Sequence, residues 1–310
     1  MVHLVCLSPY DPENNFLYCP SFPAAVLFTA LFLLSTLLHI YQAFFSTHRK
    51  HFCWILIMGG AWELIGLTSR IAAIVNITSQ NPAIVSVLFI LLAPLWVNAF
   101  LYVVLSRFVW YFVPERQVAG VRAERLASIF VGLDILSFFI QAIGGIMISQ
   151  TSATTKTRGI HIYMAGIGIQ ECFILGFVYL VVRFHKRMAQ LEREGPVELK
   201  ANGSANSRLR PRGSWRRPLY VLYASLVCIT IRIIFRLVEF SLGFISTITL
   251  TEAPFYTLEM LPMICAFTLW NVWHPGKALV GPESEFPSRK ERKAMKERET
   301  AAPGSEMTVV

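Results

Sequence analysis

Eight charged side chains interrupt the long apolar stretches of this 310-residue chain. A charge at bilayer depth is expensive, so such residues normally pair with one another or line a polar path. They are therefore the candidates for chemistry in this sequence. In chain order they are Glu63, Arg70, Asp134, Glu171, Arg232, Arg236, Glu239 and Glu259.

The spacing of five of these charges predicts a ladder between two helices. Glu63 and Arg70 are seven residues apart, and so are Arg232 and Glu239. Residues at this spacing return to nearly the same face of a helix. If both helices cross in the same direction, Glu63 faces Arg232 at one depth and Arg70 faces Glu239 at the other. Arg236 lies on the same helix face as Arg232 and Glu239 and is counted with the ladder. The ladder requires the two helices to be neighbours.

The ladder leaves three acids without an arginine, although Arg236 is within reach of Glu259. Such acids could meet a cationic substrate or a coupling proton, and two glutamines add polar groups at similar positions. The other interpretation, that the charges only hold the helices together, stays open. The residues predicted for a substrate or proton path are Asp134, Gln141, Gln170, Glu171 and Glu259.

Seven apolar blocks must position these side chains. The chain is 55% hydrophobic, with a mean hydropathy of +0.53. Each block has the length, roughly 20 to 25 residues, that a helix needs to cross a hydrocarbon core of about 30 Å. The fold class is therefore all-α, a polytopic seven-helix transmembrane bundle. The expected spans are 22–45, 52–76, 83–110, 126–149, 159–184, 219–245 and 254–273.

The basic residues orient the bundle. Of the 28 lysines and arginines, 23 fall in joints on one side, whereas only Lys156 and Arg158 fall on the other. Cytosolic loops carry such an excess, which predicts an extracellular N-terminus and a cytosolic C-terminus. The net charge of +9 then indicates attraction to anionic membrane lipids at cytosolic loops rather than nucleic-acid binding.

Three segments flank or interrupt the expected membrane domain at 22–276. Residues 1–21 contain no Lys or Arg, so they are expected to be an extracellular segment rather than a signal peptide. Residues 185–218 are expected to form a disordered cytosolic loop, and 277–310 a charged cytosolic tail. Only Cys6 and Cys19 would face an oxidising exterior, and the sequence leaves their pairing open. No spacing indicates a metal site or a cofactor.

Motifs spread over all seven blocks resemble the fungal RTA-like family, also called the lipid-translocating exporter or resistance-to-aminocholesterol family. The likeness extends from Tyr18 to Gly276. Leu67 and Glu259 depart from it, because the family usually has Tyr and Asp there. The matching elements are Tyr18-Cys19-Pro20-Ser21, Glu63 with Gly66 and Arg70, Leu91 to Pro94 with Tyr102 and Arg107, Asp134 with Ser137, Gln141 and Gly144-Gly145, Gly166 with Gln170, Arg232 to Gly243, Glu252 with Tyr256, and His274-Pro275-Gly276.

The resemblance implies export or transbilayer movement of lipids and amphipathic toxins, with sphingoid bases, aminosterols and porphyrins among the compounds associated with the family. It also implies an integral protein of the plasma membrane, with an endomembrane as the alternative location, and no enzymatic activity. The chain has no Gly-x-x-x-x-Gly-Lys-[Ser/Thr] loop for ATP. Movement would then be passive, proton-coupled or due to a partner.

Two other classes of protein share features with this sequence. A seven-helix receptor or lipid-stress sensor would have the same topology, but Ser106-Arg107 lacks an acid before the arginine and the last span lacks Asn-Pro-x-x-Tyr. An intramembrane hydrolase of the ceramidase type would need several histidines and acids at one depth to hold a metal. Only His39 and His161 approach the spans, so this class is disfavoured.

Overall fold

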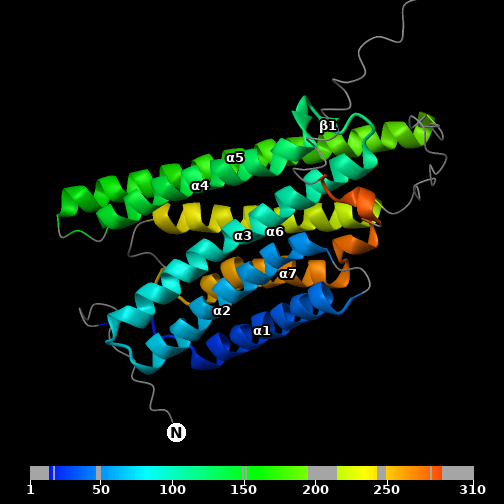
Figure 1. Ribbon diagram of the computed structural model, residues 1–310. Helices are drawn as coiled ribbons and strands as arrows, with labels where there is room; N and C mark the ends of the chain where they lie inside the picture. Colours follow the sequence, from blue (N-terminus) through cyan, green and yellow to red (C-terminus); the bar gives the residue numbers. More distant parts are fainter. Residues whose placement is uncertain are drawn as a thin grey trace, which may run out of the picture.

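The protein is a bundle of long helices, as a computed structural model shows (Figure 1). The structure describes residues 14–16, 18–46, 50–148, 150, 152–194, 215–242, 249–279 and 281–287. Seven helices in these ranges are long and apolar enough to cross a membrane, which confirms the predicted fold class. They contain α1 (Phe22–Phe44), α2 (Trp54–Val75), α3 (Gln80–Phe112), α4 (Ala123–Ile148), α5 (Ala153–Glu194), α6 (Arg216–Ser241) and α7 (Leu261–Val272). The second span begins earlier than α2, at His51, and the seventh runs from Phe255 to Lys277, because short elements extend α7 at both ends.

Short elements join or extend these helices. A 3-10 turn, η1 (His51–Cys53), leads into α2, and a π-helix, η2 (Phe255–Met260), leads into α7. Pro262 is the second residue of α7, and widening the helix before it avoids a clash between the proline ring and the preceding turn. Two more 3-10 turns, η3 (Pro275–Lys277) and η4 (Pro282–Ser284), come after α7.

The helices form a closed ring in chain order. Each packs against the next one, and α7 returns to α1. Figure 1 shows that α3 and α4 meet near the hairpin that joins them and diverge toward their other ends, so that α6 is visible between them. That hairpin, β1 (Gln117–Val118) and β2 (Val121–Arg122), was not expected from the sequence. Its turn residues Ala119 and Gly120 both have positive φ, as a type I′ turn requires.

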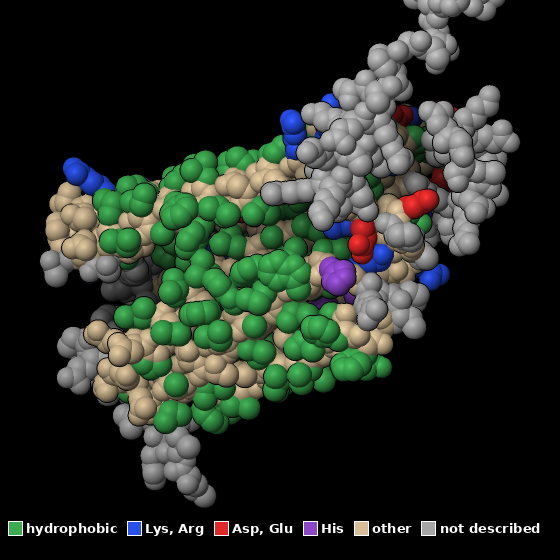
Figure 2. All heavy atoms as spheres, in the orientation of Figure 1, with side chains coloured by type: hydrophobic (Ala, Val, Ile, Leu, Met, Phe, Trp, Pro, Cys, Tyr) green, Lys and Arg blue, Asp and Glu red, His purple; other side chains and the backbone are tan. Residues whose placement is uncertain are grey.

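The outer surface of the bundle is apolar along its length and charged at one end. Figure 2 shows hydrophobic side chains covering the flank, while most of the visible charged side chains gather at the end that carries β1. We call this the basic end; it also holds residues 45, 46 and 50 and the segments 273–279 and 281–287. The opposite end holds residues 76–79, 150 and 152. This distribution is the one expected of a bundle whose flank contacts lipid.

Glycines bring neighbouring helices into backbone contact. A Cβ atom at Gly144 of α4 would lie 2.5 Å from the backbone nitrogen of Tyr163 in α5, and one at Gly66 of α2 would lie 3.0 Å from the backbone nitrogen of Ile90 in α3. Small residues at such positions allow close packing where no hydrophobic effect drives helices together. The α2–α3 and α4–α5 pairs are therefore tight units.

Adjacent glycines in α4 provide a matched test of this packing. Gly144→Ala should destabilise the protein by about 1–3 kcal/mol, because the obstructing atoms are backbone and the helices must move apart. Gly145→Ala should be neutral or stabilising by up to about 1 kcal/mol, since nothing lies within 4 Å of its Cβ position and alanine favours helix. Denaturant titration of both variants in detergent measures the difference, and equal stability would contradict the close contact.

Helix α5 extends to Glu194, so the predicted loop at 185–218 is wrong for its first part. Met188 is buried, and Arg187 pairs with Glu115 of the α3–β1 joint. The indole of Trp215 donates to Glu192 at 3.0 Å. These contacts stabilise helix beyond the apolar block that the hydropathy pattern detects. Residues 195–214 lie outside the described residues.

The beginning of the predicted solvated tail is part of the folded protein. Leu279 is fully buried, and the Lys50 ammonium donates to the Ser284 hydroxyl at 2.7 Å. The Arg107 guanidinium lies 4.5 Å from the centre of the Phe286 ring. The segment 277–287 therefore covers the basic end, and the rest of the predicted tail lies outside the described residues.

The described cysteines are of two kinds, one in a disulfide outside the spans and four free thiols within them. Cys19 is disulfide-bonded. Cys6 lies outside the described residues, so its pairing with Cys19 stays a prediction. The four cysteines within the spans are free thiols, namely Cys53, Cys172, Cys228 and Cys265.

Candidate functional site

Arg70 lies at the centre of a polar and aromatic cluster near the end of α2. Its guanidinium donates to the Tyr18 hydroxyl at 2.8 Å, to the Tyr256 hydroxyl at 3.3 Å and to the Glu252 carboxylate at 2.9 Å. The guanidinium carbon also lies 4.2 Å from the centre of the Phe255 ring, a cation–π distance. Three segments that are far apart in the sequence thus converge on one arginine.

This cluster fixes the N-terminal segment over the helix ends. The backbone N–H of Ser21 donates to Glu252 at 2.6 Å, and the Asn15 amide donates to the Ile77 carbonyl at 2.6 Å. Burial raises the pKa of Tyr18, so its phenol stays neutral beside the arginine. The N-terminal segment is therefore a built part of this end of the bundle.

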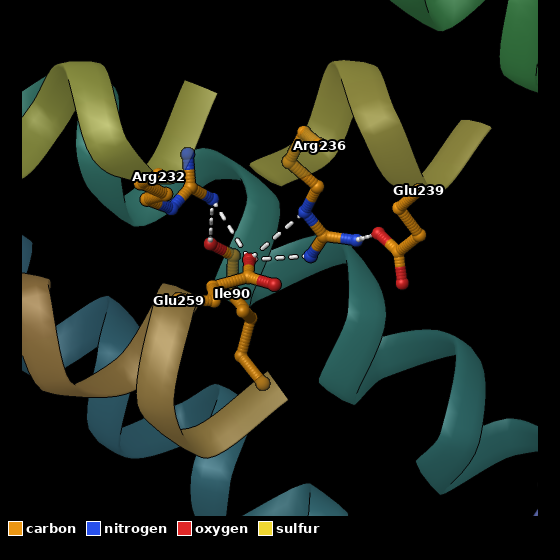
Figure 3. Close-up of polar contacts among 5 residues, drawn as sticks. All are labelled: Ile90, Arg232, Arg236, Glu239 and Glu259. Atoms are coloured by element: carbon orange, nitrogen blue, oxygen red, sulfur yellow. Dashed lines mark hydrogen bonds and ion pairs between the residues drawn. The ribbon is translucent and has the colours of Figure 1, made fainter. Parts of the chain in front are cut away.

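Glu259 receives two arginines from α6 (Figure 3). Arg232 donates to its Oε1 atom at 3.1 Å, and Arg236 donates to the same oxygen through two nitrogens, with the Nε distance at 3.1 Å. Arg236 also binds Glu239 at 2.9 Å, three residues along the same helix. The π-helix η2 carries Glu259, and it is fully buried. Two carboxylates, Glu259 and Glu239, thus balance the charge of the two arginines, and Glu259 contacts both of them.

A proline in α3 supplies a further acceptor for this pair. Pro94 has no N–H, so it cannot bond to the carbonyl of Ile90 four residues earlier, which is left without its helical partner. Arg232 donates to that carbonyl at 3.3 Å (Figure 3). The proline therefore creates the backbone acceptor that ties α6 to α3.

The structure corrects both rungs of the predicted ladder. Arg70 pairs with Glu252 rather than Glu239, and Arg232 pairs with Glu259 rather than Glu63. The ladder required α2 and α6 to be neighbours, but they are not among the helix pairs that pack along their length. The chain leading into α7 instead brings its own acids, Glu252 and Glu259, to these arginines.

Glu63 does not form the ion pair with Arg232 that the ladder predicted. Its side chain is fully buried in α2, and neither carboxylate oxygen has a hydrogen-bond partner among the described residues. Conversely, Glu259 was expected to stand apart from the ladder, with Arg236 within its reach, and the structure pairs it with Arg236 and Arg232. The interior charges are thus grouped around Glu259 rather than in two rungs.

Asp134 joins α4 to α3 at a sealed position. Its Oδ2 atom accepts from the Asn98 amide at 3.0 Å and from the Tyr102 hydroxyl at 2.9 Å. The Tyr102 ring packs against Phe130 and Phe177, with centroids 5.3 and 4.6 Å away. We call Tyr102, Phe130 and Phe177 the aromatic seal. Asp134 is not among the residues that line the two cavities described next. Two neutral donors bind its Oδ2 atom, whereas its Oδ1 atom is buried without a hydrogen-bond partner among the described residues.

A cavity of about 250 Å³ lies near the end opposite the basic end. It brings the Arg70 cluster and the Glu259 cluster together, because Arg70, Arg236 and Glu239 all line it. The rest of its wall is largely apolar and comes from the N-terminal segment, α3, α5 and α6. It includes Phe16, Tyr18, Ser86, Val87, Ile90, Ile160, Phe240 and Phe255.

A smaller hollow of about 20 Å³ lies deeper in the bundle, between α3, α4, α5 and α6. Arg236 lines both spaces, and Arg232 lines the deeper one. Gln141 donates to Gln170 at 3.0 Å there, so two predicted path residues meet as a pair. Glu171 points elsewhere and is hydrogen-bonded to Thr230 of α6.

Sequence reasoning missed several partners in this region. Tyr18 and Glu252 were matched to the family but lie outside the expected spans, so they were not considered as partners of Arg70. Asn98 and Tyr102 carry no charge, so the search for charges passed over them. The sequence did contain the signal for the free carbonyl of Ile90, because a proline within a helix leaves the carbonyl four residues earlier without its N–H partner. Across the described ranges, no three His, Cys, Asp or Glu side chains are grouped as a metal ion would require.

Comparisons with known proteins agree with this organisation. The chain is 42% identical over 287 residues to the "Probable lipid transporter atnI" of Emericella nidulans, covering 90% of this chain and 72% of the relative. It is 29% identical to the "Lipid-translocating exporter-like protein RTA1" of Leptosphaeria maculans, covering 86% and 52%. It is 24% identical to the "Sphingoid long-chain base transporter RSB1" of Saccharomyces cerevisiae, covering 84% and 73%.

No solved structure matches the chain. The family model for RTA1 like protein matches residues 56–281, a range that holds the Glu259 cluster, the Arg70 cluster except for Tyr18, and most of the residues lining the cavities. This match and the 42% identical relative confirm the resemblance seen in the sequence. The chain belongs to the RTA1-like protein family.

Proposed function

We propose that this protein moves lipids or other amphipathic molecules across the plasma membrane, exporting them from the cytosol. The observation that carries the proposal is the cavity of about 250 Å³ with charged groups at membrane depth. Intramembrane charges in such a setting are typical of substrate or ion pathways. The names of the relatives, a lipid transporter, a lipid-translocating exporter and a sphingoid long-chain base transporter, support the same function.

The proposed orientation places the basic end in the cytosol and the N-terminus outside. The sequence from Lys277 to the C-terminus and the joints on the same side carry the excess of lysine and arginine, which the positive-inside rule assigns to the cytosol. The large cavity then lies toward the extracellular leaflet. Anionic lipids of the cytosolic leaflet would contact the basic end.

The cavity wall favours a substrate that carries a positive charge and a hydrocarbon tail. Arg70 and Arg236 are both engaged by carboxylates, at 2.9 Å to Glu252 and 2.9 Å to Glu239. Glu239 keeps 23% of its side-chain surface exposed, and its second oxygen points away from Arg236 (Figure 3). A protonated amine can bind this oxygen while its tail lies along the apolar wall. Glu239 thus replaces Asp134 as the proposed contact for an amine.

Reconstitution in liposomes tests the proposed function. Purified protein should move a fluorescent sphingoid base between leaflets faster than protein-free liposomes do, with and without a pH gradient. Flux without a gradient indicates a facilitator, whereas flux that requires one indicates proton coupling. Binding without any flux would instead favour a receptor or lipid-stress sensor and would overturn the proposal.

Glu239→Gln should separate charged from neutral substrates. We expect the flux of a cationic amphiphile to fall about tenfold, because the variant loses roughly 1.4 kcal/mol of attraction for the amine. The flux of a neutral lipid of the same chain length should stay at the wild-type level. Glu115→Gln, in an exposed ion pair at the basic end, is the matched control and should change neither flux. Equal flux of the cationic probe through Glu239→Gln and wild type would remove this residue from the site.

A further inference from the structure

We propose that lipid moves through a groove beside α3, with its headgroup inside the bundle and its tail still in the bilayer. The proposal rests on the function proposed above and adds the route. We call this space the lateral groove; it consists of the larger cavity, bordered mainly by α3, α5 and α6, and the smaller cavity between α3, α4, α5 and α6, which share Arg236 in their walls.

The groove opens sideways at α3. Val87 lines the larger cavity, yet 63% of its surface is exposed on the outside of the bundle. One residue therefore borders both the cavity and the lipid-facing flank. Figure 1 shows α3 and α4 diverging here, and Figure 2 shows the surface hollowed between them toward the end opposite the basic end.

The inner wall of the groove is polar and its rims are apolar. Glu239, Arg236 and Arg232 follow one another along α6, and the deeper part continues to the Gln141–Gln170 pair. The rims facing the opening are hydrophobic. They are formed by Val87, Leu91 and Leu95 of α3 and Phe138 of α4. A polar inner wall between apolar rims matches a molecule whose polar headgroup and apolar tail prefer different surroundings.

The groove extends over more than half of the length needed to cross the membrane. Ala83 and Leu95 mark its extent along α3, and twelve residues at 1.5 Å each give roughly 18 Å, against about 30 Å for the hydrocarbon core. Beyond it, Asn98 and Tyr102 hold Asp134, and the aromatic seal fills the space between α3, α4 and α5. The lateral groove is thus open toward the end opposite the basic end and closed toward the basic end.

This geometry restricts the headgroup but not the tail. The deeper space holds only about 20 Å³, room for about one water molecule, so the helices must part for a headgroup to pass Gln141 and Gln170, and they part least for a compact one. A tail that stays between lipid chains meets no wall, and its length and number of chains are unconstrained. The substrate class is therefore a lipid with a small polar headgroup, whatever its tail.

A tryptophan at the mouth of the groove tests the route. Val87→Trp should lower the flux of a fluorescent sphingoid base in liposomes about tenfold, equivalent to about 1.4 kcal/mol of barrier, because the indole blocks the opening. Ile84→Trp is the matched control. Ile84 lies one turn away on α3, is 61% exposed and does not line the cavity, so its variant should keep the wild-type flux.

A pair of probes tests the route in the wild-type protein without any variant. One sphingoid base carries its fluorophore at the end of the tail and the other carries it on the headgroup amine. The tail-labelled probe should move and the headgroup-labelled probe should not. Equal movement of the two probes, or wild-type flux through Val87→Trp, overturns the lateral groove alone. No flux of either probe through the wild-type protein overturns the proposed function and the route with it.

Discussion

Replacing Glu259 with glutamine should destabilise the protein by about 3–5 kcal/mol, the usual cost of removing one partner from a buried ion pair. The carboxylate is fully buried and is shared by Arg232 and Arg236, so the variant leaves two cations with reduced compensation. Glutamine keeps the shape, which restricts the change to charge. Denaturant titration in detergent and the amount of protein reaching the membrane measure the loss.

The matched control for Glu259 is Glu239, which binds the same Arg236. Its side chain is 23% exposed, so Glu239→Gln should cost no more than about 1 kcal/mol, as expected for a partly solvated pair. The two variants thus separate stability from transport, because Glu239→Gln should lose flux of the cationic amphiphile while keeping its fold. Equal stability of the Glu259 and Glu239 variants would show that the arginine pair does not depend on Glu259.

Arg70→Lys should be nearly as damaging as Arg70→Ala, although both side chains carry a positive charge. The guanidinium binds two phenols and a carboxylate at once and lies over the Phe255 ring, whereas an ammonium cannot present this planar fork. We expect a loss of about 3 kcal/mol or more on denaturant titration. The released N-terminal segment should become sensitive to proteases.

Arg187→Lys is the control for this substitution. Arg187 pairs with Glu115 at the basic end, and both side chains are about one-third or more exposed, so the same change there should cost about 0–1 kcal/mol. Protease cleavage of the N-terminal segment should match the wild type. If Arg70→Lys behaves like Arg187→Lys, the geometry of the guanidinium does not hold the cluster together and charge alone suffices.

The helices and the identity of the interior charges were predictable, but their pairing was not. Hydropathy gives the seven spans because each apolar block must be long enough to cross the bilayer. The pairing depends on which helices are neighbours, and a sequence period carries no such information. Arg70 and Glu239 share a plausible depth, yet Glu252 lies closer to Arg70 because the chain folds back before α7.

The uncharged partners of Asp134 and the extension of α5 could not be predicted from the sequence either. Asp134 was expected to be a contact for an amine, but Asn98 and Tyr102 bind it, and a hydropathy pattern does not distinguish these residues from ordinary polar ones. The extension of α5 depends on contacts of Arg187 and Glu192 with distant residues. Such tertiary contacts override a local sequence that favours disorder.

The close glycine contacts determine where the bundle can change shape. Gly66 brings α2 to backbone distance of α3, and Gly144 does the same for α4 and α5, so neither pair can part without losing these contacts. The hairpin of β1 and β2 joins α3 to α4 in the chain, and the two helices diverge away from it (Figure 1). A change in the width of the lateral groove is therefore expected to move the α2–α3 pair and the α4–α5 pair against each other as rigid units, with the hairpin as the pivot.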